Sequence, residues 1–267
     1  MKLAFSTLGC PDWIWDVIFS SAKDIGMDGI EVRGVGKRIY APDCRPFRAE
    51  HIDATIEKLR SSGMEIPVLD SGCVLARSDT AAQGELEAQE YIKLAAKLGT
   101  KYIRVMCVGV PEPCEADLKL CAQVYGRICE FGEPYGVMPL IETNGPLADS
   151  KVMKEFIESI DSENKGVLWD MHHPYRYCGE SAQDTLGLIG KWIRHTHIKD
   201  SVIVDGKVEY RMLGRGDIPV KEMVYALRDM GYDGYISLEW VKRWNPNLEE
   251  AGVVFPNFAN YMRRILA

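Results

Sequence analysis

The chain has 267 residues, of which 46% are hydrophobic and 27% charged, and its formal net charge is −7 with a pI near 5.4. This composition is typical of a globular protein with a full core, and the acidic balance argues against a nucleic-acid partner, because phosphate binding requires a basic surface. No apolar run approaches the roughly 18 residues that a membrane span needs, and cysteines without a C-x-x-C motif favour a reduced, cytoplasmic setting.

Short apolar runs alternate along the chain with amphipathic helical segments and Gly/Pro/Asp turns. This is the pattern of repeated βα units around a parallel sheet. The length would also suit two smaller domains, but eight βα units can be traced, and a (β/α)8 barrel needs about 250 residues. We therefore predict an α/β fold, a single (β/α)8 TIM barrel, with one domain spanning residues 1–267.

The predicted elements follow in chain order. The strands cover residues 3–7, 29–33, 65–70, 102–107, 138–142, 167–170, 192–199 and 235–239. The first helix begins after the N-cap Asp12 and ends at residue 25. The next five helices cover residues 49–62, 85–98, 115–134, 148–160 and 182–190. The seventh helix begins after residue 219, and the eighth covers residues 248–266. Before the seventh helix, residues 202–213 carry an Asp205-Gly206 turn and are predicted as a β-hairpin.

Four of the predicted strands carry a metal-ligand residue at the C-terminal end: Glu142, Asp170, His197 and Glu239. Side chains alternate along a strand, so all four are expected to face the barrel interior. The C-terminal ends of barrel strands are also where active sites of this fold lie. Buried ionisable groups that converge in this way would repel one another unless a cation neutralised them. The sequence therefore predicts a divalent-metal site.

Three carboxylates and one imidazole form an oxygen-rich set of ligands. Such a set favours Mn²⁺, Mg²⁺ or Co²⁺ over a thiolate-rich zinc site. We expect one divalent metal, with Mn²⁺ as the first choice and Zn²⁺ still open. His195 lies two residues before His197 and faces the same way, one layer deeper, so we expect it to support the ligands rather than to bind the metal.

Four further residues are candidate substrate-binding groups: His173, Lys199, Arg215 and Arg33. His173 lies just beyond a strand end and is expected to face the substrate. Lys199 and Arg215 lie on the loop side of the seventh strand, where they would hold substrate oxygens or a phosphate, or else be solvated loop charges. Arg33 and Arg104 face inward, and the alternative for both is a structural pairing with Glu31.

Six motifs give the chain a resemblance to a known family. They lie at residues 28–33 (DGIEVR), 141–144 (IETN), 169–173 (WDMHH), 195–200 (HTHIKD), 213–219 (LGRGDIP) and 237–239 (SLE). Over essentially its whole length, the chain resembles the xylose isomerase-like, sugar phosphate isomerase/epimerase superfamily of TIM barrels, which includes endonuclease IV. In ketose 3-epimerases of this superfamily, two Glu, one Asp and one His bind a divalent metal, and the matching positions are the four given above. The resemblance further implies that Glu142 and Glu239 act as acid and base and that His173 orients the substrate.

The predicted function is a divalent-metal-dependent isomerase or epimerase acting on a sugar or ketose, phosphorylated or not. Glutamates would transfer a proton through a metal-stabilised enediolate. The alternative is a lyase, an inosose or dehydroshikimate type of dehydratase, on the same site. Five histidines and the acidic charge argue against an endonuclease IV-like nuclease, and a non-catalytic sugar-binding barrel has no need of paired glutamates. The expected partner is a small sugar or polyol, without nucleic acid or membrane, and a homo-oligomer is left open.

Overall fold

Eight parallel strands form the centre of the computed structural model, which describes residues 1–267. Their order in the sheet is β2-β1-β10-β7-β6-β5-β4-β3. The strands are β1 (Lys2–Ser6), β2 (Gly29–Glu31), β3 (Leu69–Val74), β4 (Tyr102–Met106), β5 (Met138–Glu142), β6 (Gly166–Asp170), β7 (Ile193–Ile198) and β10 (Tyr235–Leu238). Isolated parallel bridges Gly29–Glu65 and Val32–Leu69 connect the two edges of the sheet. The predicted TIM barrel is confirmed.

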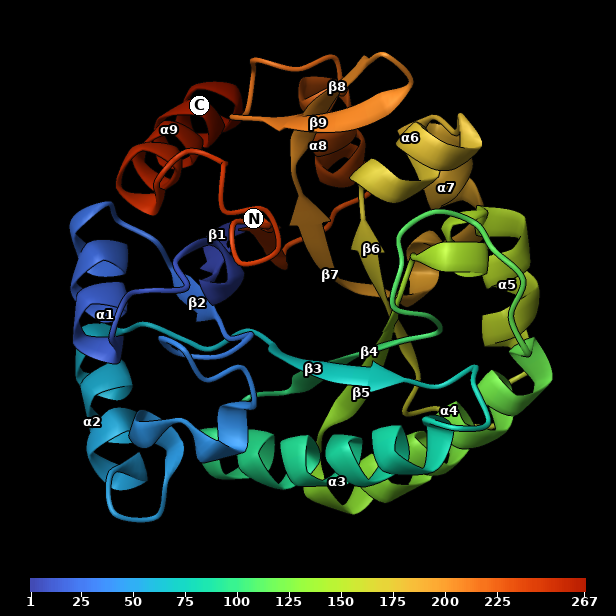
Figure 1. Cartoon of the computed structure of the whole chain (residues 1–267), viewed down its shortest axis with the longest axis horizontal. Coiled ribbons are helices and arrows are strands. Elements are labelled where there is room, and N and C mark those ends of the chain that lie inside the picture. Colours follow the sequence, from blue (N-terminus) through green and yellow to red (C-terminus); the bar gives the residue numbers. More distant parts are fainter.

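Helices cover the outside of this barrel (Figure 1). They are α1 (Trp15–Asp24), α2 (Ile52–Ser62), α3 (Ala81–Leu98), α4 (Leu118–Gly132), α5 (Ser150–Glu158), α6 (His172–Cys178), α7 (Ala182–Ile189), α8 (Val220–Asp229) and α9 (Ala251–Leu266). Short 3-10 helices lie in the connections: η1 (Thr7–Gly9), η2 (Ala41–Asp43), η3 (Arg45–Phe47), η4 (Glu133–Tyr135), η5 (Gly145–Ala148) and η6 (Gly190–Trp192). None of the helices combines the length and the apolar character that crossing a bilayer would require.

The strand register brings the predicted ligands to one level of the barrel. Asp170, the last residue of β6, pairs with His197 of β7, and His197 in turn pairs with Ser237 of β10. Strand β5 ends at Glu142, as predicted. Because neighbouring strands are parallel, their carboxyl ends meet at the same face of the barrel.

The third strand lies later in the chain than predicted, at Leu69–Val74 instead of residues 65–70. Pro67 explains the difference, since proline has no N–H to donate to a neighbouring strand. Helix α3 likewise begins at Ala81 instead of residue 85. Gly84 suggested a loop, but it lies inside the helix, where an added Cβ would come within 3.2 Å of the Val74 carbonyl. The missing side chain therefore allows close packing of α3 on β3.

Two further helix predictions were wrong in detail, and one helix was not predicted. Helix α1 begins at Trp15 with Ile14 as N-cap and no side-chain cap, whereas Asp12 is exposed and paired with Lys37. Helix α6, which contains Pro174 in its first turn, was not predicted. Proline is tolerated in the first turn of a helix, where backbone N–H groups have no partner within the helix. The fourth helix is also shorter than predicted, since it begins at Leu118 after the cap Asp117.

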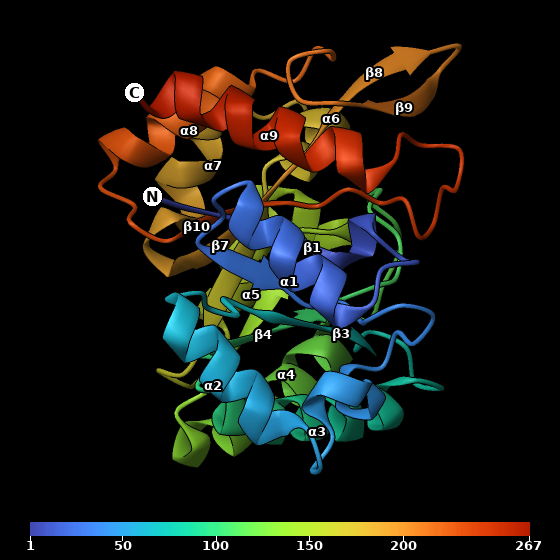
Figure 2. The same cartoon turned by 90° about the vertical axis from the view of Figure 1, so that its left-hand side faces the viewer.

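The predicted hairpin is confirmed, with slightly different bounds: β8 (Asp200–Val204) pairs antiparallel with β9 (Lys207–Arg211). Its two turn residues, Asp205 and Gly206, have φ of 49° and 76°. Positive φ at both central residues is what a two-residue hairpin turn of type I′ requires. In Figure 2 this hairpin and the loop that leads from β10 to α9 lie on the same side of the molecule.

Candidate active site

Glu142, Asp170, His197 and Glu239 converge inside the carboxyl end of the barrel. All four are buried, and one ligand atom of each lies within 4.8 Å of the others. His197 Nδ1 is 3.6 Å from Glu239 Oε1, 3.7 Å from Glu142 Oε1 and 3.9 Å from Asp170 Oδ2. The structure thus brings together the four residues that the strand ends predicted as a group.

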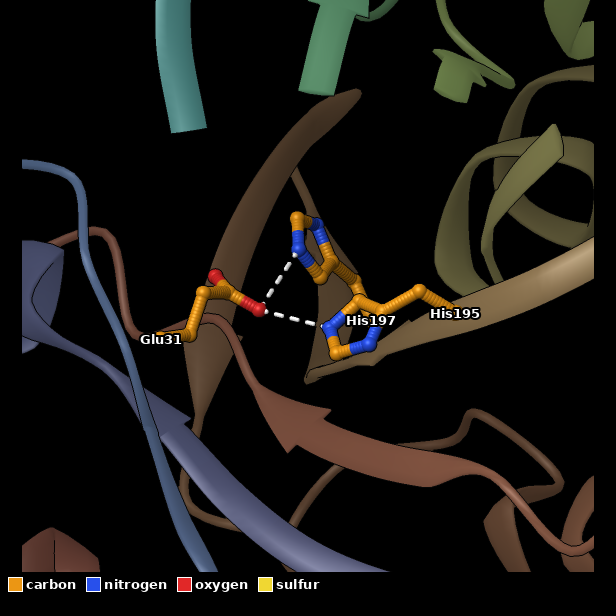
Figure 3. A group of neighbouring side chains, drawn as sticks. All are labelled: Glu31, His195 and His197. Atoms are coloured by element: carbon orange, nitrogen blue, oxygen red, sulfur yellow. Dashed lines mark hydrogen bonds and ion pairs between the residues drawn. The ribbon is translucent and has the colours of Figure 1, made fainter. Parts of the chain in front are cut away.

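The imidazole of His197 fits a metal ligand. Its Nε2 donates to Glu31 Oε2 at 3.1 Å, whereas its Nδ1 is buried and has no hydrogen-bond partner (Figure 3). Burial lowers the pKa of this ring, but the carboxylates of Glu31 and Glu239 outweigh burial and raise the pKa well above its ordinary value. The surroundings of Nδ1 therefore favour a positive charge, and a divalent cation supplies one that three carboxylates can share.

Glu31 ties this ligand to a second histidine. Its Oε2 also accepts a hydrogen bond of 2.8 Å from His195 Nε2, as Figure 3 shows. A carboxylate that bonds the far nitrogen of a ligating histidine fixes the tautomer and the orientation of the ring. His195 itself faces Glu31 and not the group of four, which agrees with its expected supporting place. Glu31 was not predicted as a functional residue.

Arg104 lies beside the group of four, not beside Glu31. Its Nη1 donates to Glu142 Oε2 at 3.0 Å, and its Nε lies 3.7 Å from Asp70 Oδ1. Burial raises the pKa of Glu142, but the charges of Arg104 and His197 hold it well below its usual range. Glu142 is therefore ionised. The alternative pairing of the arginines with Glu31 was wrong, since Arg33 Nη1 donates to the Ile39 carbonyl at 3.2 Å.

Lys199 is buried at the centre of the site. Its exposed fraction is 2%, and its Nζ donates to Asp170 Oδ2 and Glu239 Oε2. The alternative that Lys199 is a solvated loop charge is thereby excluded. Burial lowers the pKa of the ammonium, but Asp170 and Glu239 outweigh this and raise it well above its ordinary value. Arg215, by contrast, is exposed on its loop and does not reach the site.

His173 faces the site from the first turn of α6. Its Nδ1 donates to the Thr143 carbonyl at 2.9 Å, which leaves Nε2 3.4 Å from Asp170 Oδ2. A ring held in this way presents its second nitrogen to whatever lies against Asp170. Because α6 was not predicted, the sequence placed His173 correctly only as a residue just past the end of β6.

A cavity of about 590 Å³ opens onto these residues. Its walls contain Glu142, Glu239, His173 and Lys199, together with Arg33 and Arg104, and further residues from loops at the carboxyl end of the barrel. A larger cavity of about 1050 Å³ lies at the opposite end, around the first residues of the strands, and contains none of the four ligands. The smaller cavity is the candidate substrate site.

The hairpin supplies one wall of this cavity through Tyr210 of β9. Asp200, at the start of β8, holds the returning loop, because its carboxylate accepts from the backbone N–H of Gly214 at 2.9 Å, Gly216 at 2.9 Å and Ile218 at 3.2 Å. A Cβ at position 216 would lie 2.0 Å from Asp200 Oδ1, so only glycine fits there. Neither Tyr210 nor Asp200 was predicted as a site residue, although Asp200, Gly214 and Gly216 all lie in motifs that carry the family resemblance.

Comparisons with known proteins identify the fold and the family of the chain. The family model of the xylose isomerase-like TIM barrel matches residues 19–254. Fructoselysine 3-epimerase of Escherichia coli O157:H7 is 24% identical over 253 residues, which cover 90% of each chain. Among solved structures, the IOLI protein with a binding zinc atom superposes with a TM-score of 0.81 at 18% identity, covering 99% of this chain and 98% of that one. The probable 3-DHS dehydratase AsbF from Bacillus anthracis gives a TM-score of 0.80 at 17% identity, with 98% and 99% covered.

Proposed function

Since the chain belongs to the xylose isomerase-like TIM-barrel family, we propose that it is a divalent-metal-dependent epimerase or isomerase of a ketose. The observation that carries the proposal is the position of two glutamates, Glu142 and Glu239, which come from the ends of strands on either side of β7 and lie 3.7 and 3.6 Å from His197 Nδ1. The similarity to fructoselysine 3-epimerase supports the same class of reaction.

The residues that would hold the metal are Glu142, Asp170, His197 and Glu239, with Mn²⁺ as the proposed ion. The buried, unpartnered Nδ1 of His197 and the three carboxylates around it fit such an ion. A bound divalent cation acts as a Lewis acid that polarises the substrate carbonyl and so acidifies the neighbouring C–H.

The protein's own residues move the proton. One glutamate accepts the proton from the carbon next to the carbonyl, and the other returns a proton from the opposite face. Delivery to the same carbon inverts its configuration. Where the proton has been removed from C1 of the ketose, delivery to the former carbonyl carbon, C2, gives the aldose. His173 Nε2 and Lys199 Nζ are proposed to hold substrate hydroxyl or carbonyl oxygens, since both line the cavity. Arg33 is proposed as a third such group.

Proton exchange with solvent tests the proposal. The protein with Mn²⁺ is given D-psicose or fructoselysine in D₂O, and NMR follows the hydrogen on the inverted carbon. We expect deuterium there, because the proton delivered by the second glutamate is not the one removed by the first. Turnover with full retention of the original hydrogen would reject the two-glutamate mechanism.

A lyase is the second candidate, and Lys199 is the observation that favours it. An ammonium that stays charged beside Asp170 and Glu239 can hydrogen-bond a leaving hydroxyl, and the proton that a glutamate has taken from the carbon can then complete the departing water. The likeness to AsbF is one of fold alone. In this case an inosose or a dehydroshikimate-type substrate would give a dehydrated product with enone absorbance, which the experiment in D₂O detects separately.

A further inference from the structure

The loop between β10 and α9 presents an indole at the mouth of the substrate cavity. Trp244 lines the same cavity as Glu142 and Glu239, yet 59% of its surface is exposed. An exposed indole lacks the stabilisation that burial of a large apolar ring would contribute. Because this ring forms part of a cavity wall, a ligand in the cavity can bury it.

Hydrogen bonds hold the loop in this position. Lys242 Nζ donates to the backbone carbonyls of Leu248 at 2.6 Å and Pro246 at 3.1 Å. Arg243 Nη2 donates to the Gly36 carbonyl at 2.6 Å, which ties the loop to the connection after β2. Both anchoring residues directly precede the indole in sequence. The exposed ring is therefore displayed from a fixed backbone, and a ligand that stacks on it pays little ordering entropy.

The cavity changes character between its floor and its mouth. The floor holds buried charged groups, including Glu142, Glu239 and Lys199. The mouth consists of the exposed lining residues Gly109, Val110, Trp244 and Asn245, among which Asn245 alone has a polar side chain. Val110 is also 46% exposed. A ketose that reacts at the floor places its oxygens among the charges. The mainly apolar mouth then matches a portion of the ligand that lies beyond the reacting sugar.

We propose that Trp244 is a platform for the non-reacting end of the substrate, and that the substrate is a ketose extended by a second ring or an alkyl chain. This inference rests on the proposed function and narrows its substrate class. The C–H face of a sugar ring, or an alkyl chain, packs on the flat indole, while the keto end reaches the two glutamates. A free ketohexose occupies the floor alone and gains nothing from the indole.

Binding measurements on the protein supplied with Mn²⁺ test the inference. The ligands are D-psicose as the free ketose, and fructoselysine and isomaltulose as ketoses extended by a chain and by a ring. We expect at least one extended ketose to bind about ten-fold more tightly than D-psicose, a difference of about 1.4 kcal/mol. Trp244→Ala should abolish this difference, and Trp244→Phe, which keeps a flat ring, should retain most of it.

Trp192→Ala is the matched control, because Trp192 is a partly exposed tryptophan that does not line the cavity. It should leave the affinity ratio unchanged. Equal affinities of free and extended ketoses for the wild type, or an unchanged ratio in Trp244→Ala, would overturn the inference. The inference would also be overturned if Trp244→Ala left the affinity ratio unchanged but lowered the mass measured by analytical ultracentrifugation. That result would assign the indole to a contact between copies of the chain. Because these readouts do not need turnover, tight binding without reaction would count against the proposed function alone.

Discussion

Replacing Glu31 by Gln should weaken divalent-metal binding without altering any of the four proposed ligands. The carboxylate is fully buried, and its Oε2 accepts hydrogen bonds from His195 Nε2 at 2.8 Å and His197 Nε2 at 3.1 Å. Glutamine has the same shape but offers these two N–H groups only a neutral oxygen. The glutamine side chain also carries an NH₂ group that needs an acceptor, but Nε2 of His195 and Nε2 of His197 are both donors here and cannot accept its hydrogen bond.

The expected size of the effect follows from these two bonds. Hydrogen bonds to an ionised acceptor are roughly twice as strong as those to a neutral one. Loss of a group that orients a metal-binding histidine typically costs about 10- to 100-fold in metal affinity. Since only the bond to His197 orients a proposed ligand, we expect the lower part of this range for Glu31→Gln, about 10- to 30-fold.

Calorimetric titration of metal-free protein with Mn²⁺ at neutral pH measures this effect. Glu65→Gln is the control, since Glu65 also bonds to two side chains, Lys2 and Tyr235, but lies at the opposite end of the barrel. It should bind Mn²⁺ as the wild type does. A Glu31→Gln protein with an unchanged circular dichroism spectrum and an affinity within about two-fold of the wild type would refute the reasoning.

Three other predictions concern the same end of the barrel. Glu142→Gln and Glu239→Gln should each lower kcat by about 10²- to 10⁴-fold with the fold intact, and near wild-type turnover in either would reject its acid/base role. His197→Ala should reduce metal occupancy, measured by elemental analysis, more than His195→Ala does, because only His197 Nδ1 faces the three carboxylates; the reverse order would contradict the site. Gly216→Ala should lower the free energy of unfolding by about 1–3 kcal/mol in urea titrations, since its Cβ would meet Asp200 Oδ1 at 2.0 Å. A Gly216→Ala protein as stable as the wild type would contradict the tight fit of this loop.

The sequence predicted both ends of every barrel strand to within two residues, except for the third strand. Glu142 and Asp170 close β5 and β6, as expected, because a strand of alternating pattern that stops at a charged residue leaves little freedom of register. The third strand was misplaced because Pro67 interrupts the pairing that its apolar pattern suggested. The unpredicted helix α6 shows the converse: Pro174 lies where the helix does not need its N–H.

The contacts around the predicted ligands could not be read from the sequence. Glu31 and His197 are 166 positions apart, and nothing in local pattern says that β2 and β7 bring their side chains to one point. Arg104 illustrates the same limit, since alternation predicts that it faces inward but not whether it meets Glu31 or Glu142. Arg215 lies in the motif at residues 213–219 and is nonetheless exposed. Its neighbours Gly214 and Gly216 account for the motif instead, through the backbone bonds that they donate to Asp200.

The surroundings of the two glutamates differ in a way that bears on their proposed roles. Each turns one oxygen toward His197 Nδ1 and the other toward a cation, which is Arg104 for Glu142 and Lys199 for Glu239. A guanidinium does not give up its proton in proteins, so Arg104 keeps Glu142 a charged carboxylate. The raised pKa of Lys199 likewise keeps its ammonium charged, and its three N–H groups can bond a substrate oxygen as well as the two carboxylates. Because the proposed epimerisation runs in both directions, each glutamate would remove a proton in one direction and deliver a proton in the other. The difference between Arg104 and Lys199 therefore concerns which substrate oxygens they can bond rather than a fixed order of action.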